Sequence, residues 1–267
     1  MSQLDQFVLQ CYKNISNNKN LEVESAIGYL DRRGVKPVTV DLHKIGYCCS
    51  QDVIPEEVLF YGMKPEKKEK YPRGFDYWIR NKIIVPIYSE FEELVGFATR
   101  SPSFEKGESW WNLSHPFRKS EHLFLLDKAR KDIFKNNKVY LVEGYMDALI
   151  LMQEGLAEVV AVMGTKLSYR KIGLIARYCN NVCICLDVDQ NNSGQTAQQE
   201  FIYALKGFGF CESMSIIEGL PMGEDPDVFA IRNGLKAFLK LEKTLNEAEI
   251  VEIYKKVLEK KRKKEYV

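Results

Sequence analysis

Six acidic residues lie at or near the ends of apolar runs in the second half of the chain. They are Glu143, Asp147, Asp187, Asp189, Asp225 and Asp227. Carboxylates brought close together repel one another, and the usual remedies are a raised pKa or a bound cation. Ligand sets made only of oxygen favour Mg²⁺ or Mn²⁺. If the fold gathers these residues, they predict a divalent-metal site able to support phosphate chemistry.

The elements that would gather them alternate regularly from Lys138 onward. The apolar runs KVYLVEG, EVVAVMGT, NVCICLDVD and SMSIIEG read as strands, and helical patterns of about 10 to 15 residues separate them. This alternation predicts a mainly parallel sheet, whose strand ends and following loops share one edge. The acidic residues fall at that edge. Glu143 would act as a metal ligand or general base, and Gly144 would let the chain turn sharply after it. Asp147 would either support the metal or cap the helix.

An ordinary structural explanation competes with the metal site. An aspartate at a strand end is most often a turn residue or a helix N-cap, and EDPD suits the first turn of a helix. The arrival of three separate acidic elements at one predicted edge favours the metal site over a set of unrelated caps.

The first half of the chain has a less regular pattern. Residues 22–34 predict a helix, and the runs at 82–88 and 94–99 predict a hairpin around SEFEE. Residues 1–20 read as a loosely held leader, and the charged stretch 64–74 reads as a surface loop. We therefore expect an N-terminal α/β subdomain over 1–136, a metal-binding domain over 137–230, and a charged helical segment over 231–267.

Composition narrows the class of protein. The chain is 45% hydrophobic and 28% charged, with a net charge of +1, so affinity for nucleic acid would require local clusters of basic residues. It contains neither a membrane-length apolar run nor a signal peptide pattern, which predicts a cytoplasmic protein. None of its seven cysteines forms a CxxC pair, so we expect no zinc site and a reducing compartment.

The order of motifs gives a resemblance. VEGYMD, MGTKLS, CLDVD and PMGEDPD together resemble the Toprim domain of bacterial-type (DnaG-like) DNA primases. The upstream segments YLDRRGV, IGYC, RNKIIVPIYSEFEELVGFATR and FRKSEHLFLLDKA are similar to the same family. The resemblance spans about residues 26–234. It implies a mixed α/β subdomain followed by a Rossmann-like Toprim domain with a mainly parallel sheet.

The resemblance also implies roles for individual residues. Glu143, Asp187 and Asp189 would bind the metal for nucleotidyl transfer, with Asp225 and Asp227 in support. Asp147 and Tyr145 match the first Toprim motif, which makes Asp147 a catalytic candidate and Tyr145 a nucleotide-binding one. The basic residues that would hold template phosphates and the incoming triphosphate are Arg80, Lys82, Arg100 and Lys119. The adjacent Trp110 and Trp111 are expected to be packing residues.

Some features depart from the family pattern. Val188 separates the two aspartates where a glycine is common, and about two extra residues precede Gly194. A cysteine-rich zinc-binding domain usually precedes this core in the family, and we expect this protein to lack it and to have a helical region of only about 33 residues after the core. We therefore expect template selection, initiation and helicase recruitment to need another protein.

The leading interpretation is a compact primase that makes short RNA primers on single-stranded DNA for replication, and its expected origin is a phage, a mobile element or an excised catalytic core. Its substrates would be ribonucleoside triphosphates, and its partner a replicative helicase or a separate template-recognition protein. One alternative is a Toprim nuclease or topoisomerase-like enzyme. Another is a non-catalytic module that binds DNA or a helicase, which the repulsive set of carboxylates disfavours.

Overall fold

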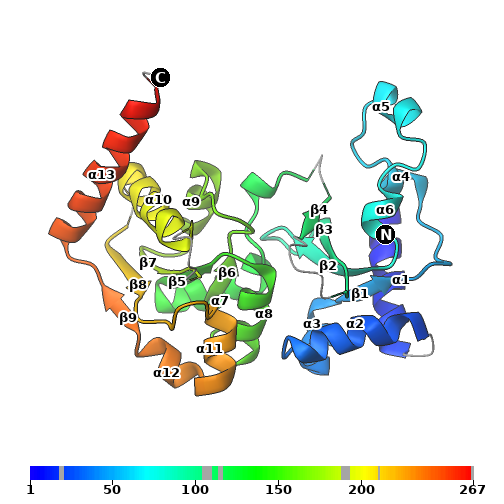
Figure 1. Ribbon diagram of the computed structural model, residues 1–267, viewed down its shortest axis with the longest axis horizontal. Coiled ribbons are helices and arrows are strands. Elements are labelled where there is room, and N and C mark those ends of the chain that lie inside the picture. The colour runs from blue at the N-terminus through cyan, green and yellow to red at the C-terminus, as the bar shows by residue number, and fades with distance from the viewer. Residues whose placement is uncertain (18–20, 104–109, 114–116, 188–192, 210, 266–267) are drawn as a thin grey trace. The chain divides into compact units, whose positions relative to one another are not determined.

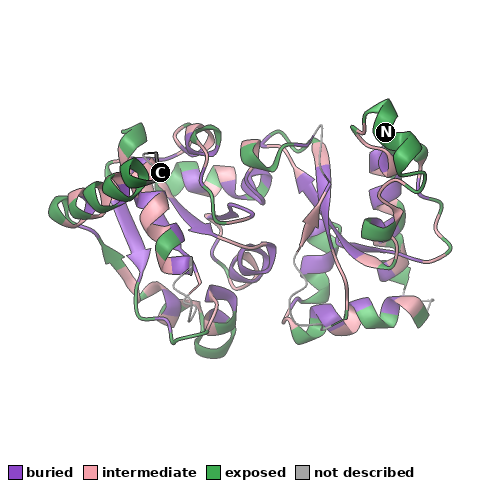
Figure 2. Ribbon diagram, turned by 45° about the horizontal axis from the view of Figure 1, so that its top comes forward, coloured by how far each residue is buried: buried purple, intermediate pink, exposed green. Residues whose placement is uncertain are grey.

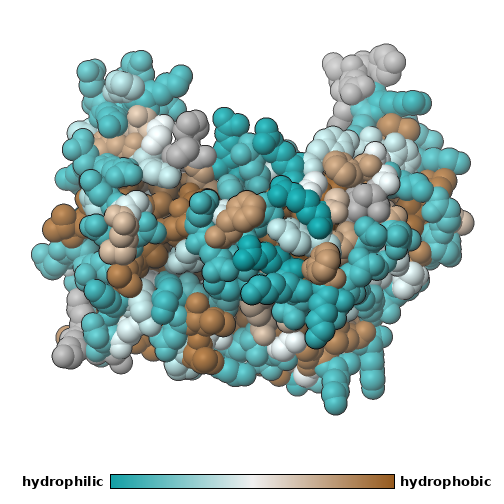
Figure 3. Space-filling model, turned by 180° about the vertical axis from the view of Figure 1, so that it is seen from behind, coloured by the Kyte–Doolittle hydropathy of each residue, from teal (hydrophilic) through white to brown (hydrophobic). Residues whose placement is uncertain are grey.

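In the computed structural model the chain forms two compact units, Met1–Lys119 and Ser120–Val267 (Figure 1). The structure describes residues 1–17, 21–103, 110–113, 117–187, 193–209 and 211–265. Asp189 and Val188 lie outside these ranges. Within the described ranges, no helix combines the length and apolar character that crossing a membrane requires. The face of the molecule seen in Figure 3 is mostly hydrophilic, with scattered hydrophobic patches.

The first unit is built on an antiparallel sheet in the order β1-β2-β3-β4. The strands are β1 (Gly46–Cys48), β2 (Lys82–Tyr88), β3 (Leu94–Arg100) and β4 (Trp111–Asn112). The predicted hairpin is confirmed: β2 pairs with β3, and Glu92 adopts a positive φ of 67° in the connecting turn. The enrichment of β-branched and aromatic residues in these runs explains why sequence pattern alone located them.

Among the described residues of this unit, six α-helices accompany the sheet. They are α1 (Gln3–Asn17), α2 (Leu21–Arg32), α3 (Pro37–His43), α4 (Glu56–Leu59), α5 (Pro65–Lys70) and α6 (Asp76–Ile79). The prediction of a loose leader was wrong, because α1 buries Leu4, Phe7, Val8, Cys11 and Ile15 along one face. A Cβ on Gly46 would lie 2.4 Å from the carbonyl carbon of Cys11, so α1 packs directly on β1. The stretch 64–74 also contains a short helix, α5, rather than loop alone.

The second unit contains the predicted parallel sheet. Its strands are β5 (Lys138–Val142), β6 (Val159–Ala161), β7 (Asn181–Cys185), β8 (Ser213–Ile217) and β9 (Glu242–Thr244), in the order β6-β5-β7-β8-β9. The first four strands are parallel, and β9 pairs antiparallel with β8. The segment 231–267 was predicted as a charged helical segment, and β9 is a short strand within it that the prediction did not include. Its polar sequence EKT carries no strand signal.

Helices cover both faces of this sheet (Figure 1). They are α7 (Leu126–Asn136), α8 (Tyr145–Gln153), α9 (Tyr169–Ile175), α10 (Ser193–Phe208), α11 (Pro226–Asn233), α12 (Leu235–Leu239) and α13 (Glu247–Glu265). One core cluster joins α7, α9, α10 and α13 to alternate strand residues such as Leu141 and Ile184. On the opposite face, α8 and α11 pack against each other. Strands β5 to β8 are almost wholly buried, whereas β9 and most of α13 are exposed (Figure 2).

Candidate functional site

The sheet of the second unit has a topological switch point between β5 and β7. The chain passes from β5 to β6 on one side, and then crosses to β7 and β8 on the other. Val142 and Cys185, the last residues of β5 and β7, are register partners. Glu143 and Asp187 follow them at the same edge. Ligands of open α/β sheets bind in the crevice at such a point, so these two residues are well placed to hold one.

Glu143 lies at the start of α8. The N–H of Gly164 donates to the carbonyl oxygen of Glu143 at 3.2 Å, which ties the ends of β5 and β6 together. The N–H of Gly144 donates to Oδ2 of Asp147 at 3.2 Å. Asp147 is only 6% exposed. The sequence left two roles open for Asp147, supporting the metal and capping the helix. The structure shows the hydrogen bond of a helix cap. The metal role stays a prediction.

Asp187 lies two residues after the end of β7, with its Oδ1 buried. Gly194, in the first turn of α10, packs against it: a Cβ on Gly194 would lie 1.9 Å from the carbonyl oxygen of Asp187. Only glycine allows this approach of backbone to backbone. Asp189, predicted as a metal ligand and catalytic residue, lies outside the described residues.

The remaining acidic pair belongs to α11. Asp225 is its N-cap residue, followed by Pro226 at the first helical position, as the sequence EDPD suggests. Asp227 is 1% exposed, and its Oδ1 accepts a hydrogen bond from the N–H of Val228 at 2.7 Å. Both residues lie at the start of a helix, and the Asp225 side chain makes no capping hydrogen bond there. Their supporting role toward a metal stays a prediction.

The donor set at the switch point contains only carboxylate oxygens, which fits Mg²⁺ or Mn²⁺ better than a softer ion. Among the described residues, the only group of three donors within 4.8 Å of one another lies elsewhere, in the first unit: Cys11, Cys48 and Asp52. Both thiols are fully buried. Oδ2 of Asp52 accepts hydrogen bonds from Cys49 N–H and Asn14 Nδ2, each at 2.7 Å. This group belongs to the packing of α1 on β1.

The predicted basic residues lie in the first unit and differ in their surroundings. The Arg80 guanidinium donates to Asp76 Oδ1 at 2.7 and 2.8 Å and to the carbonyl oxygens of Ser50 and Asp52 at 2.6 and 3.1 Å. The hydrogen bond to Asp76 raises the pKa of Arg80 despite its partial burial. Arg80 therefore braces the loop after β1, and phosphate binding by it stays a prediction.

The three other basic candidates differ in their solvent exposure. Lys82 and Arg100 are half-buried, and Lys119 is exposed. Tyr145 is only 3% exposed and packs edge-on against Phe124, with ring centroids 4.9 Å apart. Burial raises the pKa of the Tyr145 phenol. The described position of Tyr145 is that of a packing residue, and nucleotide contact by it stays a prediction.

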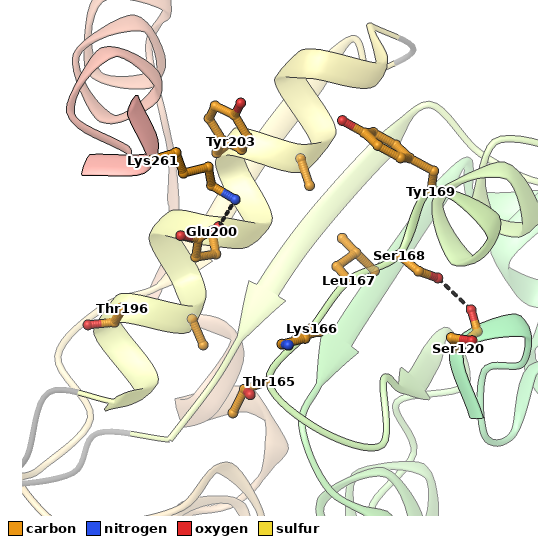
Figure 4. A pocket seen from close by; sticks show the side chains of 12 residues that line it. Ser120, Thr165, Lys166, Leu167, Ser168, Tyr169, Thr196, Glu200, Tyr203 and Lys261 are labelled. Atoms are coloured by element: carbon orange, nitrogen blue, oxygen red, sulfur yellow. Dashed lines mark hydrogen bonds and ion pairs between the residues drawn. The ribbon is translucent and has the colours of Figure 1, made fainter. Parts of the chain in front are cut away.

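Sequence pattern did not locate a pocket of about 960 Å³ in the second unit, between the β6–α9 loop, α10 and α13 (Figure 4). Lys166 from the MGTK motif borders it. Lys261 of α13 forms an ion pair with Glu200 of α10 at 2.7 Å across one wall. Its walls come from elements far apart in the sequence, so only their packing reveals it. Sequence pattern also missed Tyr77 and Trp78 as an exposed aromatic pair, although DYWIR places them beside Arg80.

Comparisons with known proteins give one family match lying largely within each of the two units. Residues 12–130 match the family described as DNA primase catalytic core, N-terminal domain, and residues 140–230 match the Toprim-like family. Toprim domains bind divalent metals. The DNA primase of Clostridium acetobutylicum is 34% identical over 166 residues, which cover 61% of this chain and 26% of that protein. The DNA primase of Staphylococcus epidermidis is 29% identical over 244 residues, covering 87% of this chain and 40% of that protein.

Solved structures share the fold. The zinc-binding and RNA polymerase domains of the Aquifex aeolicus primase superpose with a TM-score of 0.67 at 26% identity, covering 92% of this chain and 63% of that one. The Escherichia coli primase catalytic core gives a TM-score of 0.72 at 24% identity, with coverage of 90% and 78%. The chain spans two fifths or less of the two curated relatives described above.

Proposed function

Because the chain belongs to the family of DnaG-type primase catalytic cores, we propose that it is a DNA primase, a nucleotidyltransferase that makes short RNA primers on single-stranded DNA for replication. The observation that carries the proposal is the position of Glu143 and Asp187 at the ends of adjacent parallel strands, at the switch point of the Toprim-like sheet. Two family matches in this order on one chain support it.

In the proposed reaction, the 3′-hydroxyl of the growing RNA attacks the α-phosphate of a ribonucleoside triphosphate, and pyrophosphate leaves. Glu143, Asp187 and Asp189 would hold Mg²⁺ or Mn²⁺, with Asp225 and Asp227 in support. When bound, the metal stabilises charge on the entering and leaving oxygens. Asp147 would stabilise the first turn of α8, next to Glu143, by accepting a hydrogen bond from Gly144 N–H. We therefore assign Asp147 a positioning role in addition to its predicted catalytic role.

The basic residues of the first unit would bind phosphates. We propose that Lys82, Arg100 and Lys119 contact the template and the triphosphate, since lysine and arginine form charge-assisted hydrogen bonds with phosphate oxygens. Further partners would be a replicative helicase or a separate template-recognition protein. The division into segments 1–136, 137–230 and 231–267 stays a prediction, whereas the two compact units of the structure divide between Lys119 and Ser120.

One assay tests the function. The protein is incubated with single-stranded DNA, labelled ribonucleotides and Mg²⁺ or Mn²⁺, and wild type is compared with Glu143→Gln and Asp187→Asn. We expect template-dependent RNA from the wild type and a loss of at least 100-fold in both variants, in line with the effect of removing a charge-stabilising group. Circular dichroism would check that both variants fold.

A second arm supplies a short primer annealed to the template. Extension of a supplied primer without new initiation would support the polymerase and show that initiation needs a partner. Cleavage of the DNA without synthesis would overturn the proposal in favour of a Toprim nuclease. Binding of DNA with neither synthesis nor cleavage would overturn it in favour of a non-catalytic module. The comparisons favour neither alternative.

A further inference from the structure

Four aromatic side chains form a connected series of ring contacts in the first unit, which we call the aromatic ladder. Its members are Phe75, Tyr77, Trp78 and Trp111. Phe75 and Trp111 are half-buried and pack against the core of the unit. Tyr77 is 74% exposed and Trp78 is 46% exposed. The ladder therefore runs from the core outward and ends in two rings that meet solvent.

The ring geometry is specific. Trp78 and Trp111 lie nearly parallel, with an interplanar angle of 9° and centroids 6.0 Å apart. Tyr77 stands almost perpendicular to Trp78, at 84° and 5.2 Å. The ammonium group of Lys82 lies 5.9 Å from the centroid of Tyr77. A positive charge therefore lies beside the most exposed ring of the ladder.

One buried residue on β3, Thr99, connects the two elements that carry the indole rings. Thr99 on β3 is 2% exposed, and its hydroxyl donates to the carbonyl oxygen of Trp78 at 2.7 Å. Thr99 is also the register partner of Trp111 on β4. One strand residue thus holds α6 and β4 in the positions that stack the two indoles. Rings held in advance lose little conformational entropy when a ligand stacks on them.

Exposed aromatic rings beside a cation match one class of ligand. Every base of a single strand has a π-face that can stack on tyrosine or tryptophan, and each base is followed by a phosphate that a lysine can bind. The stretch 64–74, which leads into α6, adds five basic residues against two acidic ones. An anionic aromatic polymer satisfies both the exposed rings and this charge.

We propose that the outer end of the aromatic ladder is a stacking platform for single-stranded DNA. Bases of the strand stack on Trp78 and Tyr77, and Lys82 binds an adjacent phosphate. The platform rests on the proposed primase function for the identity of the strand. Its binding step needs neither metal nor nucleotide, so it can be tested apart from catalysis.

The test measures binding of a fluorescein-labelled oligo-dT by fluorescence anisotropy, without divalent metal, at several salt concentrations. Trp78→Ala and Tyr77→Ala should each weaken binding about 5- to 100-fold, because each removes a stacking surface. The slope of log Kd against log salt should stay unchanged in both. Lys82→Gln should instead lower that slope by about 0.7, the value for one single-strand phosphate. Trp78→Phe keeps a ring and should bind nearly as wild type.

Phe91 provides a matched control. It is 67% exposed in the turn between β2 and β3 and lies outside the ladder. Phe91→Ala should bind oligo-dT as wild type does. Equal weakening by Phe91→Ala, unchanged binding by Trp78→Ala, or a Trp78→Phe variant as weak as Trp78→Ala would each overturn the platform. If the wild type synthesises RNA but the Trp78→Ala variant binds oligo-dT normally, the platform is overturned and the primase proposal stands.

Discussion

Gly194 and Asp187 are in backbone contact at the end of β7. A Cβ on Gly194 would lie 1.9 Å from the carbonyl oxygen of Asp187 and 3.0 Å from its carbonyl carbon. The first turn of α10 therefore closes directly on the residue that we propose as a metal ligand. The spacing between CLDVD and Gly194 differs from the family pattern, yet a glycine still occupies the position where the two backbones meet.

Gly194→Ala should consequently displace Asp187 or the start of α10. We expect it to lower stability by about 1–3 kcal/mol, the usual cost of overpacking, and to lower primer synthesis by more than the stability loss explains. Chemical denaturation and the RNA synthesis assay measure the two effects. Gly173→Ala is the control, because a Cβ there meets no atom within 4 Å. Normal synthesis by Gly194→Ala would contradict a tight coupling of α10 to the metal edge.

Substitutions of Asp147 and Glu143 should have different effects, the first on stability and the second on RNA synthesis. Asp147→Ala removes the acceptor for Gly144 N–H and should lower stability by about 1 kcal/mol, as the loss of a helix cap does. Glu143→Gln should leave the melting temperature nearly unchanged and abolish synthesis. Thermal unfolding with and without Mg²⁺ checks this: Mg²⁺ should stabilise wild type and Asp147→Ala but not Glu143→Gln. An Asp147→Ala variant with wild-type stability would show that the cap is unimportant.

The sequence pattern was sufficient for the parallel sheet, because short apolar strands separated by amphipathic helices have few alternative arrangements. It also located Glu143 and Asp187 at the sheet edge, because both residues follow the carboxyl end of a strand and the carboxyl ends of parallel strands lie at one edge. It did not find β9, whose polar residues EKT become a strand only because β8 offers an open edge. It misread residues 1–20 as a leader, although Leu4, Phe7, Cys11 and Ile15 recur at helical spacing.

The role of individual polar residues was harder to predict. Arg80 matched a family motif for phosphate binding, but its donors reach Asp76 and the carbonyl oxygens of the loop after β1. Such partners depend on tertiary packing, and residue type cannot distinguish a solvent-facing guanidinium from one turned inward. Tyr145 illustrates the same limit, since a tyrosine after a strand end can face a ligand or fill a core.

Arg80 gives a third prediction. Arg80→Lys should lower stability by about 1–3 kcal/mol, because one ammonium cannot replace a guanidinium that bonds a carboxylate and two carbonyl groups at once. Lys82→Gln, two residues along, should leave stability unchanged and reduce the salt dependence of DNA binding. Denaturation and anisotropy on both variants test the contrast. The reverse result, an Arg80→Lys variant as stable as wild type and an Arg80→Gln variant with a lowered salt slope, would show that Arg80 binds phosphate.

Glu242 on β9 connects the edge strand to the rest of its sheet through a polar network. Its carboxylate accepts hydrogen bonds from Lys138 Nζ at 2.6 Å, Ser215 Oγ at 2.5 Å and Tyr140 Oη at 2.9 Å. Burial pushes the pKa of Glu242 up, but these donors outweigh it, so the pKa is held below its ordinary value of 4.5. The charged form is therefore favoured in the folded state.

The pH dependence follows in sign from that lowered pKa. The contribution of Glu242 to stability is fully present above pH of about 4.5 and is lost as the pH falls through the lower folded-state pKa. Glu242→Gln should destabilise the protein by about 1–3 kcal/mol at pH 7, and the difference from wild type should shrink toward pH 3. Glu247→Gln is the control, since its ion pair with Lys206 is largely exposed on the Glu247 side and contributes little. Urea denaturation across this range measures both variants. A difference that stays constant from pH 7 to pH 3 would show that the Glu242 carboxylate gains nothing from its three donors.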